Sequence, residues 1–111
     1  MAKFNNGFGG GNMQSMLRQA QKIQEEIQKA QQTLNESEYV GMGGGDMVTV
    51  TMKGDKTLVS ISIKPEVVDP DDVEMLEDLI SAAFVDVYDK IEEATQKIMG
   101  PYSGMLGGGL F

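Results

Sequence analysis

The chain has 111 residues, which is enough for one small domain with a modest hydrophobic core. It contains neither cysteine nor histidine, which excludes disulfides, thiolate nucleophiles, zinc–thiolate sites and histidine-based acid–base catalysis. The formal net charge of −8 is unevenly spread, because residues 1–34 carry four cations and two acids whereas residues 35–111 carry five cations and 15 acids. We therefore expect a non-enzymatic protein without a cofactor or metal, with a basic front part and an acidic remainder.

Glycine and asparagine dominate residues 1–11, and glycine recurs throughout residues 100–111. Such segments bury little apolar surface, so both ends are predicted to be flexible, which leaves residues 12–99 as a single domain. No apolar run approaches the roughly 20 residues of a membrane span, and the N-terminus lacks the apolar region of a secretory signal. The expected location is the cytoplasm, with no membrane partner and no small-molecule substrate.

Residues 12–37 are predicted to form a long helix, because they contain neither glycine nor proline and are rich in Gln, Glu, Lys and Ala. Apolar residues recur there at alternating spacings of three and four. This heptad pattern is typical of a coiled-coil seam or of an arm that packs on one side only. The seam consists of Met13, Met16, Ala20, Ile23, Ile27, Ala30 and Leu34.

Basic side chains project from one side of this helix, away from the seam. Arg18 and Lys22 are four residues apart, and Lys29 follows seven residues later, so the three share a face. Cations on one helix face are usually only a solvated surface, but the same arrangement suits contacts with phosphate groups. Lys3 is a further candidate for such a contact.

The stretch "YVGMGGGDMVTV" at residues 39–50 raises the question of a phosphate-binding loop. Phosphate-binding glycine loops follow a strand and open a helix. Here the glycines precede a strand, and Asp46 stands where the G-x-G-x-x-G pattern needs its last glycine. We therefore interpret the cluster as a turn-forming joint between the first helix and the sheet, since glycine supplies the positive φ angles of turns.

Two stretches of alternating β-branched and polar residues follow, separated by a turn at Gly54-Asp55. Their period of two predicts a β-hairpin with one apolar face. The segment "EYVGMG" is a weaker candidate for a third strand, because two glycines interrupt it. The apolar positions of the hairpin are Val48, Val50, Met52, Val59, Ile61 and Ile63.

The segment "DPDD" is typical of a helix start, with Asp69 as the N-cap and Pro70 in the first helical position. The predicted helix runs to Met99 with a broad apolar face, and its acidic residues are interpreted as a solvated face. The fold class is therefore α+β, with a helix, two or three antiparallel strands and a second helix. The sheet and second helix are expected to form the core and most of a dimer interface, through Val48, Val50, Val59, Ile61, Ile63, Leu76, Ile80 and Phe84.

The chain resembles the YbaB/EbfC family of bacterial nucleoid-associated proteins over residues 12–99. The similarity is carried by "MLRQAQKIQEEIQKAQQTL", "GGGDMVTVTMKGDKTLVSISIKPEVVDPDD" and "VEMLEDLISAAFVDVYDKI", of which the last two are specific. The resemblance implies an α-β-β-β-α homodimer whose first helices project as arms in a tweezer-like shape. It also implies binding of double-stranded DNA, a place in the nucleoid, and an influence on nucleoid organisation, gene expression or DNA repair, without catalysis.

Charge geometry, and not a family motif, assigns the DNA contacts to Arg18, Lys22, Lys29 and Lys3. The alternative function is a coiled-coil adaptor that binds a replication or repair factor, or another basic partner, through its acidic part. The heptad seam and the acidic remainder are compatible with both functions. A measurement of duplex-DNA binding distinguishes them.

Overall fold

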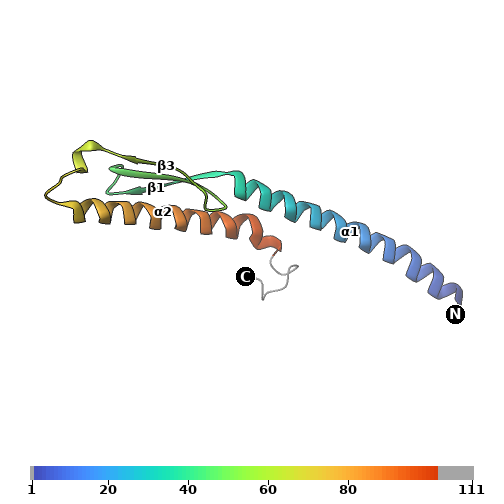
Figure 1. The fold of residues 1–111 in the computed structure, drawn as a ribbon. Coiled ribbons are helices and arrows are strands. Elements are labelled where there is room, and N and C mark those ends of the chain that lie inside the picture. The colour runs from blue at the N-terminus through green and yellow to red at the C-terminus, as the bar shows by residue number, and fades with distance from the viewer. Residues whose placement is uncertain (1, 103–111) are drawn as a thin grey trace.

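The computed structural model describes residues 2–102, with side chains from residue 13 onward, so residues 103–111 of the predicted tail lie outside the described part. The predicted α-β-β-β-α order is confirmed, including the third strand in "EYVGMG". The chain is elongated, with extents of 85 × 22 × 16 Å, because the first helix projects from a body formed by the sheet and the second helix (Figure 1). The elements are α1 (Ala2–Glu36), β1 (Glu38–Gly43), β2 (Val48–Lys53), β3 (Leu58–Ile63), a 3₁₀ turn (Pro65–Val67), α2 (Val73–Met99) and a second 3₁₀ turn (Gly100–Tyr102).

The helix α1 begins at Ala2, earlier than the predicted start at residue 12. Glycine lowers helix propensity, but no proline interrupts this segment, and extension of an existing helix adds one hydrogen bond for each residue fixed. The seam is buried only at its base, since Leu34 is 2% exposed whereas Met13 and Met16 are 64% and 66% exposed. In the single chain, α1 is therefore an arm anchored at its C-terminal end.

The three antiparallel strands lie in the order β1-β2-β3, and α2 covers one face of this sheet (Figure 1). In the central strand, Val50 pairs with Gly41 of β1 and with Ile61 of β3. The inward side chains of β2 are buried, because Val48 and Val50 are 0% exposed and Met52 is 2% exposed. The hydrophobic core lies between β2 and the helix side chains Ala83, Val87 and Ile91.

The strand β3 departs from the predicted core. Val59 and Ile61 are 45% and 41% exposed, although the alternation placed them on the apolar face. The reason is the lateral position of α2, which packs mainly against β1 and β2. The expectation that these two side chains lie in the core is therefore wrong for the single chain. Other predicted core positions are partly buried against the core cluster: Ile63, Leu76, Ile80 and Phe84.

The glycines of the cluster have two roles: they allow α2 to pack closely on β1, and they form the turn that follows β1. Gly41 is buried beneath α2, and a Cβ added there would overlap the carbonyl oxygen of Ala83. Gly44 and Gly45 have φ angles of 63° and 75° and form the turn into β2. The turn prediction therefore holds, but the cluster is not the joint between helix and sheet. That joint lies upstream at Ser37, between the end of α1 and the start of β1.

The helix α2 begins at Val73, later than the predicted first position at Pro70. Asp72 is the N-cap, because its side chain accepts a hydrogen bond from the backbone N–H of Met75 at 3.2 Å. Asp69 instead accepts a backbone hydrogen bond within the turn around Pro70, at 2.9 Å. The fixed φ of Pro70 is compatible with a turn as well as with the first position of a helix. Here Pro70 lies in a turn, and Asp72, which directly precedes the apolar run of α2, is the N-cap.

Candidate functional site

Three basic side chains form a row on the projecting arm. Arg18, Lys22 and Lys29 are all exposed. At about 100° per residue they lie within about 40° of one another on the helix surface, roughly opposite the apolar seam. Glu25 shares this face and lowers its net charge. We call the three basic residues the cationic row. Lys3, the fourth predicted contact, has a side chain outside the described residues.

Among the described residues, no ion pair involves the cationic row, whereas two cations of the body are paired. The ammonium of Lys64 lies 2.8 Å from the carboxylate of Asp46. This hydrogen-bonded pair lowers the pKa of Asp46 and raises the pKa of Lys64. Lys90 lies 3.4 Å from Asp86 on the next turn of α2. The cations of the arm are therefore left available to an external anion.

Two side chains of α2 close the outer edge of β1. The carboxylate of Asp86 accepts a hydrogen bond from the backbone N–H of Met42 at 2.9 Å. The ammonium of Lys90 donates to the carbonyl oxygen of Val40 at 2.8 Å. The bond from Met42, and to a smaller extent Lys90, lowers the pKa of Asp86 against the opposing effect of desolvation. Because these two backbone groups are occupied, the edge of β1 is less open to a further strand.

The sequence prediction missed this closure. Asp86 was interpreted as part of a solvated acidic face, and Lys90 was given no role. The partners lie 44 and 50 positions away along the chain, so no local spacing reveals them. The sequence offered only indirect evidence. An edge strand has backbone N–H and C=O groups without strand partners, and a neighbouring element usually covers them.

An open groove of about 440 Å³ lies at the base of α1. Two of its amide side chains form hydrogen bonds with the residue four positions later in the helix: Gln31 donates to Asn35 at 3.0 Å, and Gln32 donates to Glu36 at 3.2 Å. The groove therefore extends the polar surface of the arm onto the body. It is lined by Gln28, Gln31, Gln32, Asn35, Glu36, Lys53 and Asp55.

The fold and the cationic row define a small α+β protein with a basic projecting arm. Within residues 2–102, no helix is long and apolar enough to cross a lipid bilayer. In the same range, no three acidic side chains are grouped so that they could hold a metal ion. The chemistry that these residues offer is the binding of an anion by exposed, unpaired cations.

Comparison with known proteins assigns the family. The sequence profile of the YbaB/EbfC DNA-binding family matches residues 9–106. A nucleoid-associated protein of Enterococcus faecalis is 48% identical over 100 residues, which cover 89% of this chain and 96% of that protein. A nucleoid-associated protein of Clostridium botulinum (strain Eklund 17B / Type B) is 50% identical over 113 aligned positions, which cover 100% of both chains. The chain therefore belongs to the YbaB/EbfC DNA-binding family, as the resemblance predicted.

A solved structure has the same fold. The crystal structure of an uncharacterized protein from Helicobacter pylori aligns with a TM-score of 0.58 and 22% sequence identity. The alignment covers 71% of this chain and 92% of that chain. At this level of identity the likeness supports the arrangement of helices and strands alone.

Proposed function

We propose that this chain is a non-enzymatic nucleoid-associated protein that binds double-stranded DNA as a homodimer, through the cationic rows of two α1 arms. The observation that carries the proposal is the cationic row itself, which is exposed and unpaired among the described residues of a helix that projects from the body. Membership of a DNA-binding family and the nucleoid-associated relatives support DNA as the ligand and the nucleoid as the location.

The dimensions of the row suit a phosphate backbone. Arg18 and Lys29 are 11 residues apart, which is about 16 Å at 1.5 Å per residue. Phosphates on one strand of duplex DNA rise by about 3.4 Å each, so a row of this length reaches several of them. Residues 13–36 contain no aromatic side chain on which an unpaired base could stack. The row therefore favours a duplex over a single strand.

Titration of the full-length protein with a fluorescent duplex, and with one strand of the same sequence, tests this proposal at low salt. We expect saturable binding with a lower Kd for the duplex. Binding to neither DNA, combined with recovery of a basic replication or repair protein from a bacterial lysate, would support the adaptor function instead. Equal affinity for both DNAs would contradict the preference for a duplex.

The open edge of β3 supports the homodimer. Within residues 2–102, β3 pairs with β2 alone, and its Val59 and Ile61 side chains are 45% and 41% exposed in the single chain. The opposite edge of the sheet is occupied by Asp86 and Lys90 at 2.9 and 2.8 Å from backbone atoms of β1. Soluble proteins rarely leave an apolar strand at an uncovered edge, so β3 is the side at which a second copy is expected.

The adjoining flank of α2 extends this apolar surface. Phe84 and Tyr88 form a ring pair with centroids 6.2 Å apart, and Tyr88 is 43% exposed. At about 100° per residue, these two lie on the side of α2 away from Asp86 and Lys90. A second copy seated on β3 would cover this flank as well. Such an arrangement uses Val59, Ile61 and Phe84, which the sequence assigned to the core and dimer, and adds Tyr88, which the sequence did not.

The substitution Ile61→Asp is expected to convert the dimer to a monomer, because it places a charge in the centre of the proposed interface. The matched control is Ser62→Asp, since Ser62 is exposed on the opposite face of the same strand. Sedimentation equilibrium should give twice the chain mass for the wild type and for the control, and the mass of one chain for Ile61→Asp. A wild type that stays monomeric throughout the micromolar range would rule out this interface.

A further inference from the structure

The turn between β2 and β3 holds the base of α1. The backbone N–H of Gly54 donates a hydrogen bond to the carbonyl oxygen of Ser37 at 3.0 Å. Ser37 is in turn fixed to the helix, because its N–H and its hydroxyl both donate to the carbonyl oxygen of Thr33, at 3.0 and 2.6 Å. Leu34 is 2% exposed beside this contact. The end of α1 is thus held against the β2–β3 turn by one backbone hydrogen bond and a buried side chain.

Gly54 permits an approach that a larger residue would prevent. A Cβ added at this position would overlap the carbonyl oxygen of Leu34 and would lie 2.7 Å from its carbonyl carbon. The obstacle is backbone and cannot rotate away, so a side chain here must move the end of α1 away from the turn. The geometry of the contact depends on the absence of a side chain at residue 54.

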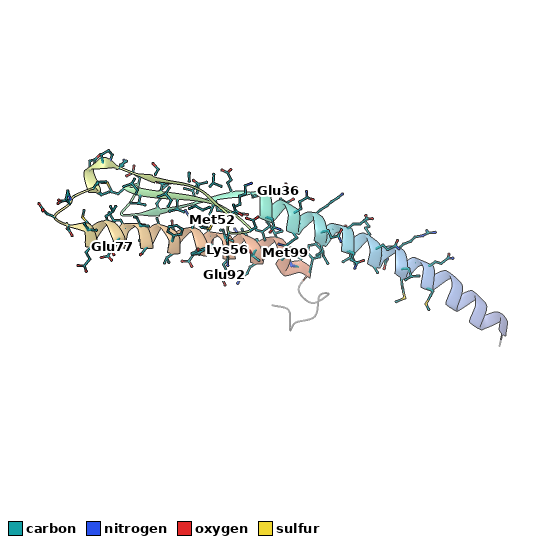
Figure 2. The ribbon with its side chains drawn as sticks, viewed as in Figure 1. Glu36, Met52, Lys56, Glu77, Glu92 and Met99 are labelled. Atoms are coloured by element: carbon teal, nitrogen blue, oxygen red, sulfur yellow. The ribbon has the colours of Figure 1, made fainter. Side chains whose placement is uncertain are left out.

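The rest of the arm has little to fix its direction. α1 packs against β2 and against α2, whose last residue, Met99, lies near the base of the arm and is 3% exposed (Figure 2). Ala30, Ile27 and Ile23 are half-buried, and further out exposure rises to 66% at Met16 and 64% at Met13. Within the described side chains, the direction of the arm is therefore decided at its base.

We propose that Gly54 is a positioning residue that sets the angle at which α1 leaves the body, an inference that rests on the proposed function. Arg18 lies 16 residues beyond Leu34, which is about 24 Å along the helix, so a tilt of about 10° displaces it by roughly 4 Å. That displacement is comparable to the rise of about 3.4 Å between phosphates on one strand. A changed joint would therefore misplace the cationic row on DNA without altering any charge.

The test compares Gly54→Ala with Gly100→Ala in the full chain. Gly100 is a matched control because a Cβ added there would contact none of the described residues beyond its own helix and chain neighbours. Spin labels are attached to cysteines introduced as Gln24→Cys on the arm and Ser62→Cys on the sheet, both exposed positions of a chain that has no cysteine of its own. Labelled chains are diluted into unlabelled ones, and the distance within one chain is measured by pulsed electron resonance.

We expect Gly54→Ala to shift the label-to-label distance by a few ångströms and to weaken duplex binding about tenfold. Gly100→Ala should leave both unchanged. Ser37→Gly, which removes the hydroxyl bond to Thr33 without adding bulk, should broaden the distance distribution, and it serves in place of Gly54→Ala if that variant does not fold. An unaltered distance distribution in both joint variants overturns the inference. A wild type that does not bind duplex DNA overturns the proposed function, while the distance measurement still decides the role of Gly54.

Discussion

Replacing Arg18, Lys22 and Lys29 together with glutamate should weaken duplex-DNA binding by about 1,000-fold or more at moderate salt. In a dimer, the change removes six cations from the two arms and puts six anions in their place. Each cation that neutralises a phosphate releases condensed counterions, and a reversed charge instead repels the backbone. Fluorescence anisotropy with a labelled duplex measures the change in Kd.

The fold should not respond to this triple substitution. All three side chains are exposed, and no ion pair within the described residues involves them. The free energy of unfolding should therefore stay within about 0.5 kcal/mol of the wild type for each site. Glu25→Gln is a control with the opposite expected effect. It removes the negative charge that shares the face of the cationic row, so it should tighten duplex-DNA binding. Unchanged affinity in the triple variant would show that DNA contacts another surface.

Gly41→Ala should destabilise the fold by about 3 kcal/mol or more, although it adds only a single methyl group. The added Cβ would overlap the carbonyl oxygen of Ala83 and would lie 2.7 Å from the Cβ of Val87. Both groups belong to α2, so relief requires the helix to move off the sheet. The core residues beneath it, Val48 and Val50, would then lose part of their contact. Urea unfolding followed by circular dichroism measures this loss.

Gly45→Ala is the control within the same cluster. Gly45 has a φ of 75°, but a Cβ added there would lie more than 4 Å from every described residue other than its chain neighbours. Its cost should be only the strain of a left-handed backbone, about 1–2 kcal/mol. A loss for Gly41→Ala no larger than that for Gly45→Ala would mean that α2 accommodates the added methyl group, and that its close approach does not explain the glycine at position 41.

Local patterns predicted the elements of this fold well. Alternation of apolar and polar residues located β2 and β3, and even β1 was found despite its glycines. The start of α2 was misplaced because Asp69 and Asp72 both accept backbone hydrogen bonds, Asp69 at the start of a turn and Asp72 at the start of the helix. Only the geometry of the turn around Pro70 decides which of them caps the helix. The element order was therefore predictable, but this boundary was not.

Burial on β3 could not be predicted from alternation. Period two gives the face on which Ile61 lies, and that face is correct, since Ile61 pairs directly with the buried Val50. Alternation does not reveal the irregularity opposite Thr51 and Met52, which leaves Val59 without a partner in the register. Alternation does not give the lateral position of α2 over the sheet. Because the helix packs mainly on β1 and β2, the same face is buried in the central strand and exposed at the edge.

The cationic row was predictable because helical spacing is local, whereas the positions that hold the arm and protect the sheet are not. Gly54 contacts Leu34 and Ser37 across a long stretch of chain, and Lys90 reaches the backbone of β1 from a position 50 residues away. Sequence alone showed a glycine in a turn and a lysine on a helix. Their roles depend on which elements the fold brings together.

The salt dependence of duplex binding by the wild-type protein tests the central claim most directly. If six cations of the two arms neutralise phosphates, log K should fall linearly with log salt with a slope of about −5. The triple glutamate variant should lose most of this slope along with its affinity. A wild-type slope near zero, or no duplex binding even at the lowest salt, would contradict the account.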